Sequence, residues 1–293
     1  MKKFTKKGII ITSIVSILSI GLGTGVGLYF GQEFLTNKTN YDALDANNLE
    51  DDNKALYQKY LNMNDYSSLE SYQLVNISLY KLTTLDYFSS IEEGEAVASG
   101  ITQTINGKNI KNKSSYFNES ISNSSLVHIA KRFYQNDNEI DEYTGNVKSA
   151  TSAEYQENSK AISPLNEFEN KWGKTLDRPC IYIISSKTVV SSNVNFYDNQ
   201  YQITLELDPS TSVIRYVKQM KSMSQLNSYP EFSKVNLTFT LDSKLTLLEF
   251  ETEETYEVFK FGKHNTNGKL KTTYFYDLEE KMPSLNEEGV KEN

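Results

Sequence analysis

Apolar and polar residues alternate along two stretches in the second half of the chain. From Tyr201 to Leu207 the odd-numbered residues are apolar or aromatic and the even-numbered ones polar, and residues 235–241 repeat this pattern. Successive side chains of a strand point to opposite sides of a sheet, so the alternation predicts two strands with one buried face each. Weaker patterns predict further strands over residues 97–101, 108–121, 134–143, 245–253, 255–261 and 270–276.

Apolar residues at helical spacing predict several helices between these strands. In the clearest one, Leu165, Phe168 and Trp172 share a face, Ser163-Pro164 starts the helix and Gly173 ends it. The same reasoning predicts helices over residues 54–63, 67–88, 126–133 and 208–224, the second capped by Ser67 or Ser68.

Two Asn-Gly dipeptides, Asn106-Gly107 and Asn267-Gly268, predict two-residue hairpin turns. Residues 146–162 have little pattern and indicate a crossing or a hinge in the middle of the domain. Antiparallel strands with one apolar face need cover, which amphipathic helices supply. The predicted fold class is therefore α+β, with a large curved antiparallel sheet, a half-barrel, packed against several amphipathic helices.

The N-terminal stretch from Gly8 to Phe30 contains no charged residue and follows four lysines. About 20 apolar residues cross the hydrocarbon core as a helix, so this run predicts a transmembrane signal anchor. The lysines predict a cytoplasmic N-terminus and an external C-terminal domain. A cleaved signal peptide is the alternative interpretation, although its apolar region is normally shorter.

Small residues recur at every fourth position of this segment, at Ser19, Gly23, Gly27 and Gly31. On a helix they share one face, where small side chains let two helices approach closely in lipid. A transmembrane helix partner is one interpretation, and the general frequency of glycine in membrane helices is the other.

These features predict the order of segments along the chain. Residues 1–7 form a basic cytoplasmic end, 8–31 the anchor and 32–53 an acidic tether; residues 54–280 form the external domain and 281–293 a charged tail. We therefore expect a single-pass protein of the cell membrane, in contact with the lipid bilayer. The abundance of Lys, Asn, Ile and Tyr indicates an AT-rich bacterial genome.

Charge and cysteine content exclude several functions. A formal net charge of −8 with only three arginines argues against a nucleic-acid partner, which requires a basic surface. A single cysteine, Cys180, excludes an internal disulfide framework, and its apolar neighbours in residues 180–184 indicate a small buried residue in a strand.

No catalytic or metal-binding pattern occurs. His128 and His264 lack a second ligand at zinc spacing, and no nucleophile-elbow motif is present. The acidic run 137–142 lacks the glycine and the final glutamate of a calcium loop, which indicates a solvated turn. We expect no catalytic residue, no cofactor, no metal and no enzymatic activity.

Glutamates at 249, 251 and 253 alternate with other residues and predict the wet face of a strand, whose acidity Glu254 and Glu257 extend. Solubility is the main interpretation of this face and cation binding the alternative. The chain also contains 20 tyrosines, which suit either strand positions or a glycan-binding surface.

The order of elements resembles that of the bacterial lipoprotein-carrier superfamily, the half-barrel binders of lipids and lipoproteins. The resemblance rests on GITQTINGKNIKNKSSYFNESIS with SSLVHIAKRFY, and on YQITLELDPSTSVIRYVKQMKSM followed by FSKVNLTFTLD. It covers about residues 66–280, and the chain is also similar to uncharacterised membrane-anchored external proteins of Gram-positive-type bacteria. Unlike the acylated members, it has no lipobox cysteine.

The resemblance implies a lipid or lipoprotein ligand in an apolar cleft between sheet and helices. The sequence thus supports two hypotheses: a non-enzymatic external protein that binds a lipid or acyl chain, or a single-pass structural subunit of a cell-envelope complex without a small-molecule ligand.

Overall fold

One antiparallel sheet dominates the computed structural model, which describes residues 39–51, 54–61, 63, 65–98, 100–125, 128–224, 226, 228–259, 263–276 and 279–285. Its strands are β1 (Tyr87–Ala98), β2 (Ile101–Asn112), β3 (Ser115–Asn123), β4 (His128–Gln135), β5 (Glu139–Val147), β6 (Ala153–Tyr155), β7 (Ala161–Pro164), β8 (Val189–Tyr197), β9 (Gln200–Leu207), β10 (Glu231–Asp242), β11 (Leu247–Phe259) and β12 (Lys263–Phe275).

The order of strands follows from two meanders that meet in the middle of the sheet. The spatial order is β6-β5-β4-β3-β2-β1-β12-β11-β10-β9-β8, and β7 pairs with β5. The last strand, β12, pairs with the first, β1, along residues 89–98. This pairing joins the two halves of the chain into one open sheet.

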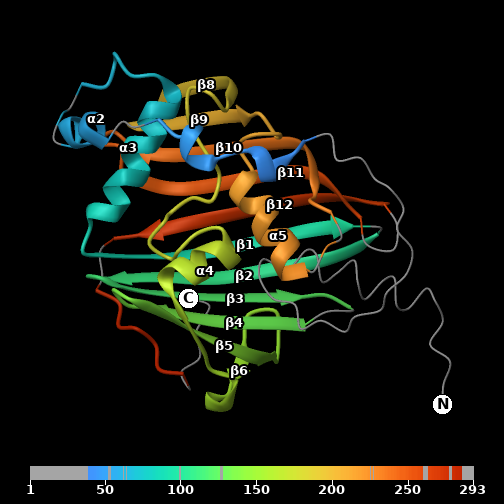
Figure 1. Ribbon diagram of the computed structural model, residues 1–293. Coiled ribbons are helices and arrows are strands. Elements are labelled where there is room, and N and C mark those ends of the chain that lie inside the picture. The colour runs from blue at the N-terminus through green and yellow to red at the C-terminus, as the bar shows by residue number, and fades with distance from the viewer. Residues whose placement is uncertain are drawn as a thin grey trace, which may run out of the picture.

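Four α-helices among the described residues lie on the same face of the sheet (Figure 1). They are α2 (Lys54–Tyr60), α3 (Ser71–Thr84), α4 (Leu165–Trp172) and α5 (Ile214–Ser224). The α3 helix contacts β8, β9 and β11, whereas α4 contacts β5, β7 and α5. We call this side of the sheet the helix-covered face.

The helix-covered face changes character from one half of the sheet to the other. On β9 and β10 it carries Ile203, Leu205, Val235, Leu237 and Phe239, all 0% exposed. Cross-strand neighbours share a face, so the register places Ser90, Glu92, Gly107, Asn109, Asn118 and Ser120 on the same face of β1–β3. The apolar half forms the main core, and the polar half leaves a less tightly covered region.

The opposite face of β3–β5 has a small core of its own. Ile121, Ala130, Tyr143 and Tyr155 are buried there, with Leu285 packed against them. The segment 279–285 lies on this face, because Tyr134 Oη donates to the Pro283 carbonyl at 3.0 Å. Part of the predicted charged tail, residues 281–285, is thus packed on the sheet.

Both predictions of Asn-Gly turns are wrong. Asn106-Gly107 lies inside β2 and Asn267-Gly268 inside β12, each paired on both sides. The chain instead turns after β2 at Lys113, whose φ is 55°. Hydrogen bonding to long strands on both sides outweighs the local turn preference of these dipeptides.

The helix predicted over residues 126–133 is also wrong, because residues 128–135 form β4. Its side chains alternate: Phe133 packs on Phe168 and Trp172, whereas Ala130 lies in the core of the opposite face. A strand with both faces buried has apolar residues at mixed spacing, which imitates a helical pattern. Likewise, residues 247–259 form one strand rather than two.

The α4 helix confirms its sequence prediction. It spans Leu165–Trp172, buries Phe168 and Trp172, and ends at Gly173 in the left-handed conformation with φ of 74°. A Cβ on Gly173 would lie 2.6 Å from the Arg215 carbonyl oxygen. Glycine therefore both ends α4 and lets it approach α5. The α3 and α5 helices were also predicted, but they begin later, at Ser71 and Ile214.

The predicted anchor, residues 8–31, lies outside the described residues. No helix in the described part of the chain is long and apolar enough to cross a membrane. Residues 39–51 of the predicted tether pack on the domain: Tyr41 is 2% exposed, and Glu50 accepts hydrogen bonds from Arg178 at 3.0 Å and Arg215 at 2.7 Å.

Candidate functional site

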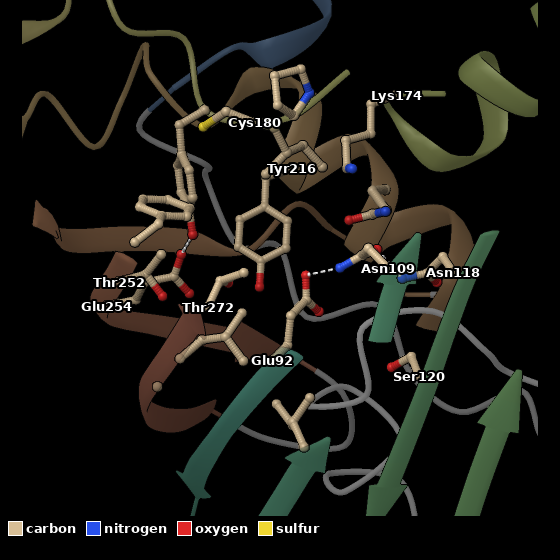
Figure 2. A pocket seen from close by; sticks show the side chains of 18 of the residues that line it. Glu92, Asn109, Asn118, Ser120, Lys174, Cys180, Tyr216, Thr252, Glu254 and Thr272 are labelled. Carbon is tan, nitrogen blue, oxygen red and sulfur yellow. Dashed lines mark hydrogen bonds between the residues drawn. The ribbon is translucent and has the colours of Figure 1, made fainter. Parts of the chain in front are cut away.

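A cavity of about 180 Å³ lies where the polar half of the helix-covered face meets α4 and α5. Strands β1–β4, β11 and β12 form its floor, and residues from α4, α5 and the irregular segment 174–182 form its roof. Figure 2 shows polar and aromatic side chains converging on this space. The cavity therefore lies in the space that the sheet and the helices leave between them.

Aromatic rings form the part of the cavity under α4. The Phe133 ring lies 5.6 Å from Phe168 and 5.3 Å from Trp172, in edge-to-face geometry. Trp172 is 4% exposed, and its indole N–H has no hydrogen-bond partner among the described residues. A buried tryptophan N–H normally finds a partner, and this one is an exception, although its nitrogen atom is itself not accessible from the cavity.

A chain of amides leads to Glu92 on the floor. Asn118 Nδ2 donates to Asn109 Oδ1 at 2.7 Å, and Asn109 Nδ2 donates to Glu92 Oε1 at 2.9 Å. Gly107 stands beside this carboxylate, and a Cβ there would lie 2.9 Å from Glu92 Oε2. The glycine thus leaves room for Glu92 to point into the cavity, where the close-up shows it (Figure 2).

A second carboxyl, Glu254, lies on β11 at another part of the floor. It is 5% exposed, and Tyr182 donates a hydrogen bond to its Oε1. Burial raises the pKa of Glu254 to about 8, with no charged neighbour contributing. Glu254 is therefore largely a neutral carboxylic acid at pH 7 as long as nothing else enters the cavity.

The Tyr216 side chain reaches from α5 into the cavity between the two carboxyl groups (Figure 2). Its ring packs edge-on against Tyr182 at 5.8 Å, and its hydroxyl has no hydrogen-bond partner in the described part of the chain. Burial raises the pKa of Tyr216 to about 12, so its hydroxyl remains protonated at neutral pH.

Two further titratable groups lie in the roof. Lys174 Nζ donates to the Arg178 carbonyl at 3.1 Å, and burial lowers the pKa of Lys174, partly countered by Glu92. Cys180 is buried as predicted, although in irregular chain rather than in a strand, and burial raises its pKa to about 12. A thiol with this pKa is a poor nucleophile at neutral pH.

The predicted site residues stand as follows. Ser19, Gly23, Gly27 and Gly31 lie outside the described residues. His128 lies on β4 and His264 on β12, and no group of metal-ligating side chains occurs within the described residues. The acidic run 137–142 is not simply solvated, because Glu142 is buried and accepts hydrogen bonds from Lys131 and Lys171.

Sequence reasoning missed the polar residues of the cavity. Glu249, Glu251 and Glu253 face solvent and pair with lysines, as the wet-face prediction requires. Glu254, expected to extend this acidic face, instead points to the other side of the strand. It faces the cavity together with Thr252 and Tyr256. Its even residue number, against the odd numbers of the three exposed glutamates, is the one sequence signal for this different orientation. No such signal exists for Glu92 and Asn109, because polar residues in a strand do not reveal which face of the sheet the helices cover.

No protein-family model and no curated protein matches the sequence. Among solved structures, the chain is similar to a DUF1329 family protein from Desulfovibrio piger, at 11% identity and a TM-score of 0.25. The match covers 71% of this chain and 92% of that one.

Proposed function

We propose that this protein is a non-enzymatic binding protein that holds one end of an amphiphile, a lipid or an acyl compound, in the cavity, with residues 8–31 anchoring it in the cell membrane. The observation that supports the proposal is the mixed lining of the cavity. Aromatic side chains of α4 offer an apolar surface, whereas Glu92, Asn109 and Tyr216 offer polar groups. Ligand sites combine apolar walls with a few polar groups in this way.

The size of the cavity limits what enters it. A cavity of roughly 150 Å³ holds a benzene molecule, and this one measures about 180 Å³. It therefore takes a group of about six to eight heavy atoms, and the rest of a larger amphiphile remains outside. The lining is more polar than the apolar cleft that the family resemblance implies, which favours a ligand with a polar group near the buried end.

A blocking variant tests the proposal. Gly268 faces the cavity from β12, and a Cβ there would meet only Glu254 Oε2, at 3.7 Å. Gly268→Leu fills this space without backbone strain. Asn265→Leu is the matched control, because Asn265 is exposed on the opposite face of the same strand.

Trp172 is the single tryptophan of the chain, so its fluorescence reports directly on the cavity. We expect hexanol to shift this emission in the full-length protein and in Asn265→Leu, and to bind at least about tenfold more weakly to Gly268→Leu. Equal affinities in all three would contradict the proposal. Thr272→Leu, at a buried position of the same floor, is a second blocking variant if Gly268→Leu does not fold.

One observation favours the second candidate function, a structural subunit of an envelope complex. The edge strand β8 carries no charged residue, and Val190 and Phe196 on it are 63% and 57% exposed. Natural sheets usually protect such an edge with charges or by shortening it. A photo-cross-linker at position 194 of the full chain, in its own membrane, tests this function. If the chain is a subunit that contacts its partner through β8, one discrete cross-linked partner should appear. If no cross-linked partner appears, β8 is excluded as the contact surface.

A further inference from the structure

Glu254 differs from the other buried carboxylates of the protein. Glu119, which is 1% exposed, pairs with Arg132, and Glu142, which is 7% exposed, pairs with Lys131. Glu254 is buried to the same degree but forms no ion pair with any residue that the structure describes. A buried carboxyl normally has a cationic partner, and here the side that would receive one opens into the cavity.

Three tyrosines line the cavity together with this carboxyl group. Tyr182 lies in the roof, Tyr216 on α5 and Tyr256 two residues beyond Glu254 on the same face of β11. Phe232 links two of these rings, with centroids 5.6 Å from Tyr216 and 4.8 Å from Tyr256. Faces of aromatic rings attract cations, most strongly when the cation is desolvated. On the fourth side, Gly268 leaves open space next to Oε2.

We propose that the Glu254 end of the cavity binds an ammonium group of the ligand, with the carboxylate as its counter-ion and Tyr182, Tyr216 and Tyr256 as its aromatic walls. This inference rests on the proposed function and adds that the ligand group bound in the cavity is positively charged. Lipid headgroups and free amines share this chemistry. The same geometry with Glu254 protonated would instead donate a hydrogen bond to a carbonyl or carboxylate of an acyl ligand, and the experiment below separates the two.

Binding of an ammonium group makes a specific demand on protonation. Glu254 must lose its proton. The titratable groups that interact with it are Tyr256, whose pKa Glu254 helps to raise, and the Tyr182 hydroxyl, which donates to it. Tyr216 lines the same cavity, and burial alone raises its pKa. Glu92 and Lys174 lie elsewhere in the cavity, and Lys269 extends outward, with its side chain 68% exposed. Glu254 is therefore the group whose ionisation controls the affinity between pH 7 and pH 9.

The size of the pH effect follows from the pKa of Glu254. With a pKa of about 8, roughly a tenth of the carboxyl is ionised at pH 7 and roughly nine tenths at pH 9. An alkylammonium ion keeps its charge over this range. The affinity for it should thus increase about ninefold from pH 7 to pH 9, with release of a proton on binding at the lower pH.

The experiment titrates the full-length protein with hexylammonium, hexanol and hexanoate while Trp172 fluorescence is recorded. We expect hexylammonium to bind at least about tenfold more tightly than the other two at pH 9. In Glu254→Gln the preference and its pH dependence should disappear, whereas hexanol binding remains and shows that the variant is folded. Glu253→Gln, on the solvent face of the same strand, is the matched control and should behave as the wild type.

The outcomes separate this inference from the proposed function. If hexanol or hexanoate binds as tightly as hexylammonium, or if Glu254→Gln keeps the preference for hexylammonium, the ammonium site is overturned while the binding cavity stands. Tighter binding of hexanoate at pH 7 than at pH 9 would assign Glu254 the role of a hydrogen-bond donor instead. If none of the three compounds binds, the proposed function fails and the inference fails with it.

Discussion

Arg132 and Glu119 form a buried ion pair on neighbouring strands, with Arg132 Nε 2.8 Å from Glu119 Oε1 and both side chains 1% exposed. The pair lies on the face of the sheet away from the cavity. Arg132 Nη1 also donates to the carbonyls of Ser284 at 3.0 Å and Leu285 at 2.9 Å. One guanidinium group thus holds the segment 283–285 against β3 and β4.

This geometry predicts that Arg132→Met destabilises the protein by roughly 3–5 kcal/mol, because it leaves Glu119 buried without a partner. The comparison is Lys234→Met, which removes a surface pair with Glu253 whose side chains are 43% and 44% exposed. That loss should cost at most about 1 kcal/mol. Urea unfolding of both variants measures the difference, and equal losses would show that the buried pair has no special role.

Glu254 predicts an unusual dependence of stability on pH. Its pKa is raised from 4.5 to about 8 in the folded protein, so the folded state keeps a proton that the unfolded state loses. The contribution of Glu254 to the free energy of unfolding should therefore be largest below pH 4.5 and should decrease as the pH rises to 8. We expect Glu254→Gln to be more stable than the wild type at pH 8 by roughly 2–4 kcal/mol. Parallel stability profiles of the two proteins would contradict this prediction.

Two glycines in neighbouring strands predict opposite effects of the same substitution. A Cβ on Gly94 would lie 2.4 Å from the Lys269 carbonyl oxygen, which the backbone of β12 holds in place. Gly94→Ala should therefore lower the thermal midpoint by several degrees, at a cost of about 1–3 kcal/mol. The Cβ of Gly268→Ala would lie within 4 Å of Glu254 Oε2 only, at an ordinary contact distance of 3.7 Å, so the midpoint should stay unchanged or rise. A larger loss for Gly268→Ala would refute the open space beside Glu254.

Cys180 offers a chemical test of how well the roof covers the cavity. The residue is 8% exposed, and burial raises the pKa of its thiol to about 12. We expect iodoacetamide to modify the native protein at least about tenfold more slowly than the urea-unfolded chain at pH 8. Rapid modification without denaturant would show that the segment 174–182 opens the cavity to solvent.

The sequence predicted the covered sheet well because strict alternation, as in residues 201–207 and 235–241, has one physical cause, a strand with one buried face. It predicted α4 because proline, an apolar face and Gly173 act together at a short helix. It failed at residues 106–107, 126–133 and 267–268, where pairing on two sides or burial of both faces determines the structure. Neither condition is visible in local spacing.

The residues that line the cavity cannot be predicted from the spacing of residue types along the sequence. Glu92 lies next to Thr272, and Glu254 next to Gly268, only because β1 pairs with β12 and β12 with β11. Glu92 and Thr272, which are 180 positions apart, meet through this long-range pairing. Composition indicated a tyrosine-rich protein, but only the fold shows that three of the tyrosines line one cavity with a buried carboxyl.

The most direct test of the account is native mass spectrometry of the full chain, produced in cells with their membranes, purified in detergent and compared with Gly268→Leu. The binding function predicts a discrete added mass on the wild-type protein that is extracted by organic solvent and is absent from the variant. The bare mass of the chain in both samples, with no extractable compound, would contradict it.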